Sequence, residues 1–125
     1  GETYLHNSSL ETVYPIAPFS RESMVKCLPG CMPMWRKSMH EGIGNFEAKY
    51  KSAGDWEMWL RAVENGSVFK MVDGVHGLYY HNPTGLSTDK TREKEKKAEE
   101  AEVFFKYAEI FGQRNFDMFK GYFSQ

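Results

Sequence analysis

The 125-residue sequence lacks several features that would assign it to a class at once. No apolar run reaches about 18 residues, so no segment is predicted to span a membrane. Its 16 Lys and Arg are balanced by 17 Asp and Glu, whereas a dedicated nucleic-acid binder needs a basic excess. It opens with no signal peptide and with Gly1 rather than Met; we therefore expect a chain that was processed or cut from a longer one.

Cysteine is scarce. Only Cys27 and Cys31 occur, with Pro29 and Gly30 between them. There is no second cysteine pair and no His-x-x-x-His, which is too little for a zinc site. We expect both cysteines to be reduced, small, buried residues of a cytoplasmic protein.

Aromatic residues are abundant by contrast, with 3 Trp, 7 Tyr and 9 Phe making 15% of the chain. They supply large apolar side chains for a core. Aromatic faces also stack on sugar rings, so a carbohydrate contact remains an alternative interpretation to the core.

The first half of the chain predicts short elements broken by proline and glycine. Ser20 is expected to cap a helix over 21–28, without a full capping box because position 23 is Ser rather than an acid. A short buried strand is predicted over 32–35 and a short helix over 38–41. Gly42 and Gly44 are expected to end that helix.

The second half carries the clearer patterns. A helix over 55–64 is predicted to end at Asn65-Gly66. Its apolar face consists of Trp56, Trp59, Leu60 and Val63. Asp73-Gly74 predicts an antiparallel hairpin of strands 68–72 and 75–80. A charge-dense helix from 90 then acquires an apolar face from Val103 to Phe111, Gly112 ends it, and a last helix covers 114–122.

Asp55 is the residue best suited to chemistry. It follows Ala53 and Gly54 at the predicted start of an aromatic helix, and glycine there allows a substrate to approach closely. However, Asp is also a preferred N-cap, and the helix dipole favours acids such as Glu57 in a first turn. From spacing alone, both the catalytic and the capping interpretation stay open.

Four ordered blocks resemble the family 2 glycosyltransferases. They are residues 34–38 (MWRKS), 44–47 (GNFE), 53–61 (AGDWEMWLR), and 78–80 with 82–87 (LYY and NPTGLS). The resemblance covers about residues 28 to 90. It implies a Rossmann-like A-type fold, a nucleotide-diphosphate sugar donor, a divalent metal, and transfer with inversion at the anomeric carbon.

The resemblance also implies roles for single residues. Asp55 matches the general base, although Gly54 stands where the family often has Glu. Gly30 resembles the loop under the bound sugar. Trp56 would face the acceptor or the core, Glu57 would join the substrate-binding set, and Arg61 would pair with a carboxylate or contact the donor.

The metal is where the sequence departs from the family. His81 lies near the family's metal-binding histidine, but alignment on Pro83 and Ser87 puts Asn82 at that place. The alternative interpretation of His81 is an ordinary surface histidine that binds no metal. No pair among the four aspartates forms the Asp-x-Asp that holds the donor's metal, and the phosphate-binding turn is absent. We therefore expect an isolated chain that is inactive and holds no cofactor, with Mg or Mn required by its longer parent.

Together these patterns predict a single α+β domain over 1–125, and the resemblance implies a glycosyltransferase-like core at 28–90 followed by C-terminal helices at 91–125. Several helices would pack on a small antiparallel hairpin, as the C-terminal part of an α/β nucleotide-diphospho-sugar transferase fold. The alternative is a non-catalytic interaction or carbohydrate-binding module that forms a homodimer through an exposed apolar surface. A hydrolase with Asp55 and Glu57 as paired carboxylates is a third hypothesis, although i and i+2 on a helix point apart.

Overall fold

The structure, a computed structural model, mixes helix and strand, as predicted. It describes residues 2–5, 13–15, 18–26, 29–30, 32–79, 82–85 and 89–125. In chain order the elements are β1 (Glu2–Leu5), β2 (Val13–Pro15), the 3-10 helix η1 (Glu22–Val25), α1 (Met39–Ile43), α2 (Gly54–Glu64), β3 (Val75–Tyr79), the 3-10 helix η2 (Lys90–Arg92), α3 (Glu93–Lys106) and α4 (Ala108–Phe123). Cys27, Cys31 and His81 lie outside the described residues. None of the helices described is long and apolar enough to cross a membrane.

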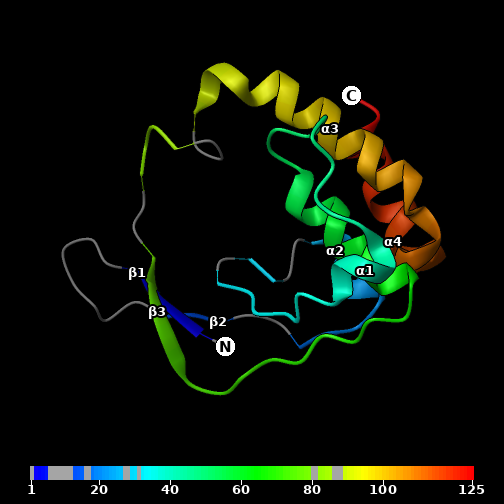
Figure 1. Ribbon diagram of the computed structural model, residues 1–125. Helices are drawn as coiled ribbons and strands as arrows, with labels where there is room; N and C mark the ends of the chain where they lie inside the picture. The colour runs from blue at the N-terminus through cyan, green and yellow to red at the C-terminus, as the bar shows by residue number, and fades with distance from the viewer. Residues whose placement is uncertain are drawn as a thin grey trace.

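The sheet is not the predicted hairpin. Its order is β2-β1-β3, with β1 antiparallel to β2 and parallel to β3, and it lies to one side of the helices (Figure 1). Residues 67–72 form no strand, and Val68 is 75% exposed. The hairpin prediction was wrong because β3 finds its hydrogen-bonding partner in a strand near the N-terminus, which a local turn signal such as Asp73-Gly74 does not reveal.

The predicted strand over 32–35 is also wrong. This segment has no regular secondary structure, Met32 has a φ of 66°, and Met34 is 92% exposed. A residue with positive φ leaves the extended region that a strand needs. The apolar run therefore reflects surface methionines and not a buried strand.

The core is built on α2. Trp56, Trp59, Leu60 and Val63 are all buried, which confirms the predicted apolar face. Met58 and Ala62 are buried as well, so the helix is enclosed on more than one side. Gly66 follows its C-cap with a φ of 93°, as the predicted termination requires.

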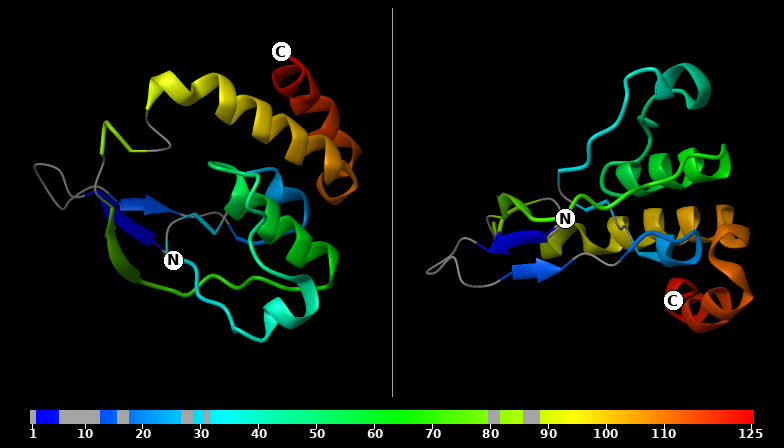
Figure 2. Two further views of the ribbon diagram at one scale, coloured as in Figure 1. Left: turned by 45° about the horizontal axis from the view of Figure 1, so that its top comes forward. Right: turned by 90° about the horizontal axis from the view of Figure 1, so that it is seen from below.

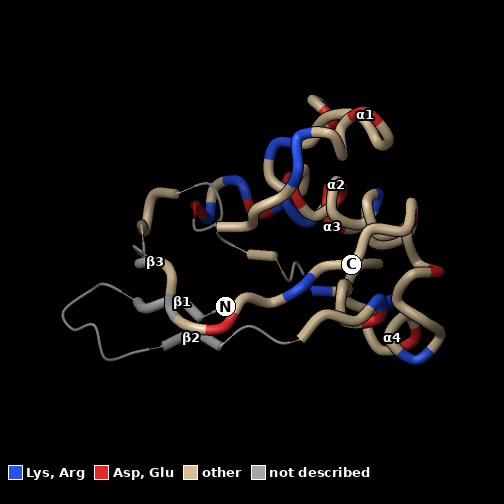
Figure 3. Tube along the Cα trace, turned by 60° about the horizontal axis from the view of Figure 1, so that its bottom comes forward, with Lys and Arg blue, Asp and Glu red and all other residues tan. Residues whose placement is uncertain are grey.

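α3 and α4 cover this core from one side (Figure 2). Both signs of charge occur along these two helices (Figure 3). The aromatic ring of Phe104 stacks on Phe111, Phe116 and Phe123 at centroid distances of 5.5, 5.6 and 4.4 Å. Gly112 breaks the helical path with φ 77° and ψ 159°, at the place predicted for a helix end.

η1 is a single turn rather than the predicted helix over 21–28. The amide of Ser23 donates to Ser20 Oγ at 3.0 Å, and the amide of Ser20 donates to Ser23 Oγ at 2.8 Å. The N-cap of the turn is Arg21 and not the predicted Ser20, and Arg21 makes no side-chain cap bond. The two serines bond to one another, and no full capping box forms, as predicted. This turn places the buried Met24, whose carbonyl accepts from Trp56 Nε1 at 2.7 Å.

Candidate functional site

Asp55 is the second residue of α2 and is exposed. The N-cap is Ala53, which has no polar side chain, and no side-chain cap bond is made there. Asp55 Oδ1 instead accepts from the Trp56 amide at 2.7 Å. Asp55 thus stands at the start of the helix, as predicted, without being its N-cap.

Gly30 and Trp56, two other predicted site residues, differ in their exposure to solvent. Gly30 is exposed and has a φ of 53°, in the left-handed region that glycine adopts without strain. Trp56 is only 5% exposed, and its ring stacks on Phe111 at 6.1 Å. Trp56 therefore lies in the core, which was one of the two positions predicted for it, and does not face an acceptor.

Glu57 is completely buried and sits at the centre of a polar network. Its carboxylate accepts from Tyr107 Oη at 2.6 Å and from Arg61 Nε and Nη2 at 3.2 and 2.9 Å. Burial raises the pKa of this carboxyl, but the bonds from Arg61 and Tyr107 outweigh it and hold the pKa below its ordinary value. Burial and the bond to Glu57 raise the pKa of Tyr107.

Arg61 extends this network to the last residue of α1 and the loop that follows it. Besides Glu57, its guanidinium donates to the carbonyl oxygens of Ile43 and Asn45, the latter at 2.8 Å. Its predicted pairing with a carboxylate is thus confirmed. A five-donor planar group is well suited to joining one carboxylate to two carbonyls. Glu57 and Arg61 therefore fix α2 against its neighbours.

The burial of Glu57 also bears on the hydrolase hypothesis. Asp55 is exposed whereas Glu57 has no exposed surface. Two carboxylates that act on one glycosidic bond must flank a common space. These two do not, which argues against the paired-carboxylate enzyme.

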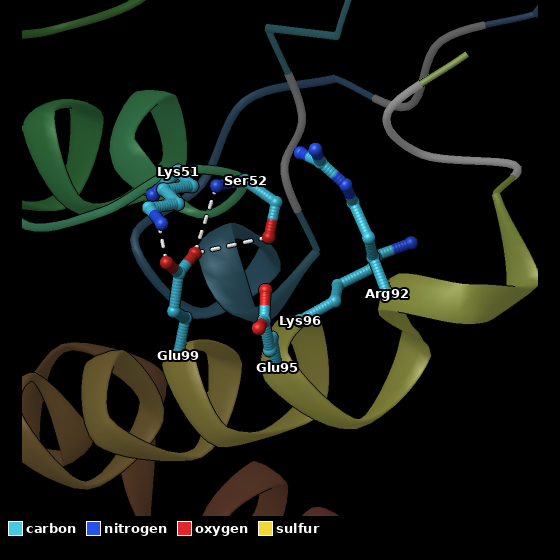
Figure 4. A pocket seen from close by; sticks show the side chains of 6 residues that line it. All are labelled: Lys51, Ser52, Arg92, Glu95, Lys96 and Glu99. Carbon is cyan, nitrogen blue, oxygen red and sulfur yellow. Dashed lines mark hydrogen bonds between the residues drawn. The ribbon is translucent and has the colours of Figure 1, made fainter.

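Glu99 of α3 is the residue that sequence reasoning missed. Its carboxylate accepts from three successive backbone amides: Lys51 at 2.7 Å and Ser52 at 2.8 Å (Figure 4), and Ala53 at 3.0 Å. It also accepts from Ser52 Oγ at 2.9 Å. No local signal separates Glu99 from the other acids of its charge-dense helix, because its partners lie 46 to 48 residues earlier in the chain.

Beside these bonds lies a small pocket between α3 and the turn before α2 (Figure 4). It is lined by Lys51, Ser52, Arg92, Glu95, Lys96 and Glu99. Its space is about that of one water molecule. It is therefore too small to be the binding site of a nucleotide sugar.

The described residues do not fit the divalent metal that the family resemblance implies. Across 32–79, 89–125 and the shorter described segments, no three His, Cys, Asp or Glu side chains are grouped as metal ligands. A hard divalent cation needs several oxygen ligands around one point. We accordingly derive no step that runs through a metal on this chain.

Comparison of the chain with family models, with curated proteins and with solved structures finds no match.

Proposed function

We propose that this chain is the acceptor-side part of a family 2 glycosyltransferase and that Asp55 is its general base. One observation carries the proposal. In the block from Asp55 to Arg61, Asp55 alone is exposed; residues 56–60 are buried, and Arg61 is bonded inside the protein. In this block, the most specific of the resemblance, Asp55 is thus accessible to a substrate, and the other side chains pack or bond inside the protein.

The proposed reaction follows from what a surface carboxylate can do. The acceptor hydroxyl oxygen bonds to the anomeric carbon of the donor sugar, the bond from that carbon to the diphosphate breaks, and the hydroxyl proton passes to Asp55. The electron pair of the broken bond leaves with the nucleoside diphosphate. A positioned base of this kind contributes about 10² to 10⁴ in rate. The donor would be held by protein outside these 125 residues, which contain no Asp-x-Asp.

The scaffold around Asp55 supports this role. The Glu57 and Arg61 network ties α2 to the loop after α1, and Tyr107 ties it to the α3–α4 junction. Glu99 holds the turn that precedes the helix. A base works only within hydrogen-bond reach of its proton, so a rigid helix start is what the reaction requires.

The test is the substitution Asp55→Asn in the intact gene product. We expect kcat for sugar transfer, measured as nucleoside diphosphate release with product analysis, to fall about 10²-fold or more while KM for the acceptor changes little. Asp73→Asn is the matched control, because Asp73 is also exposed but lies in a bend before β3. An Asp55→Asn enzyme that transfers sugar at the unsubstituted rate contradicts the proposal.

One observation favours the self-associating module as the second candidate. Several large apolar side chains are exposed, among them Met32, Met34, Phe46, Val68 and Val72. Exposed apolar side chains promote association where they form a contiguous patch. Light scattering of the purified chain over a range of concentrations distinguishes the two: a stable dimer without any sugar binding favours the module.

A further inference from the structure

Glu99 accepts hydrogen bonds from the turn before α2, which the side chain at the N-cap of α2 cannot do. α2 begins after Ala53, whose methyl group accepts no hydrogen bond. The amides of residues 51–53 precede the first turn and need acceptors. The Glu99 carboxylate supplies them from α3, and its oxygens divide the task, one accepting from Lys51 and the other from Ser52 and Ala53.

The carboxylate is held in its charged form by the same bonds. Partial burial raises the pKa of Glu99, but the amides of Lys51, Ser52 and Ala53 outweigh this and lower it. Three successive amides around one anion form a concave binding site for negative charge. The turn and the carboxylate therefore fix each other.

A neighbouring glutamate provides a useful contrast. Glu102 lies one turn further along the same face of α3 and binds the ammonium group of Lys49 and the hydroxyl of Tyr50, the latter at 3.0 Å. These are side-chain contacts, so they attach α3 to the segment without setting the direction of its backbone. Only Glu99 of this pair holds the backbone from which α2 starts.

We propose that Glu99 is a positioning residue for Asp55. By fixing residues 51–53, it sets the direction in which the first turn of α2 presents the Asp55 carboxylate. Asp55 follows Ala53 after a single glycine, so a change in the turn is transmitted directly to it. The functional meaning of this inference rests on the proposed role of Asp55 as base.

The Trp56 amide offers a readout of Asp55 that does not depend on sugar transfer. Because this amide donates to Asp55 Oδ1 at 2.7 Å, its proton signal in a ¹H–¹⁵N spectrum should move when Asp55→Asn alters that bond. The size of this movement is measured with each residue at positions 99 and 102. We expect Glu99→Ala to reduce it to less than half and to speed hydrogen exchange at residues 51–53 by about 10-fold or more.

Two further variants make the experiment decisive. Glu99→Gln retains one acceptor oxygen, so we expect an intermediate loss, and it replaces Glu99→Ala if that variant does not fold. Glu102→Gln is the matched control and should lower the melting temperature while leaving the Trp56 movement intact. If Glu99→Ala and Glu99→Gln also keep the full movement, Glu99 is merely structural and the inference is overturned. An active Asp55→Asn enzyme would overturn the proposed function instead, without affecting this result.

Discussion

Glu57 places a carboxylate in the interior, where an unpaired charge costs several kcal/mol. The cost is offset by Arg61 and by the hydroxyl of Tyr107, each within hydrogen-bond distance. Lys106 adds a weaker contact at 4.0 Å. One buried side chain thereby joins α2, the end of α3 and the loop after α1, and it leaves Asp55 as the exposed acid of this helix turn.

Removing that charge should be costly. We expect Glu57→Gln to lower the free energy of unfolding by about 3 kcal/mol, because Arg61 loses its counter-charge and an amide donor faces other donors. Urea denaturation measures the change. Glu64→Gln serves as control on the same helix, since Glu64 is exposed, and it should change the stability by less than about 0.5 kcal/mol.

The lowered carboxyl pKa values of Glu57 and Glu99 also predict how stability depends on pH. Well above the ordinary value of 4.5, both groups are ionised in the folded and unfolded chain, and their contribution is complete. As the pH falls through that value, the unfolded chain takes up protons first, so stability declines. Urea unfolding between about pH 3 and 5.5 should show this slope, and Glu57→Gln should flatten it. An unchanged slope in that variant contradicts the assignment.

At the scale of elements, the helices were predicted where apolar residues recur with helical periodicity. The helices over 55–64, from 90 and over 114–122 were predicted because their apolar residues repeat at helical spacing. The second of them ends at Lys106, before the predicted end at Gly112, and Gly112 instead kinks α4. The sheet was not predicted, because β3 pairs in parallel with β1 near the N-terminus. In the candidate site, the sequence was enough to predict that Asp55 lies exposed at the start of a helix. The role of Glu99 could not, since its partners are backbone amides that any residue could supply.

The kink in α4 at Gly112 can be tested by substitution. Its φ of 77° and ψ of 159° form a conformation that is essentially restricted to glycine. An added methyl group would meet Glu22 Cγ at 3.6 Å, an ordinary contact, so any cost arises in the backbone. We expect Gly112→Ala to lower stability by about 1–3 kcal/mol in thermal denaturation.

Gly121 provides the matched control for this substitution. It lies in the same helix, has open space around its Cα and carries no positive φ. Gly121→Ala should therefore raise stability by about 0.5–1 kcal/mol, through helix propensity. Equal effects of the two substitutions would contradict the special role of the Gly112 backbone.

At the scale of the whole molecule, the described chain consists of an aromatic core around α2 and a small sheet beside it. Among the described residues no metal ligands are grouped, and the small pocket between α3 and the turn before α2 accommodates about one water. Asp55 lies exposed at the start of α2. The proposed acceptor-side part, whose donor would be held by other protein, is compatible with these observations.

The most direct test of this account is a ¹H–¹⁵N titration of the chain with nucleotide-diphosphate sugars and, separately, with oligosaccharides selected on a glycan array. The account predicts saturable shifts at residues 53–57 with an oligosaccharide, because the acceptor hydroxyl must come within about 3 Å of the Asp55 carboxylate. It predicts no saturable shift with UDP-glucose, UDP-N-acetylglucosamine or GDP-mannose. A saturable nucleotide-sugar site on this chain, or sugar-induced shifts that avoid the first turn of α2, would contradict it.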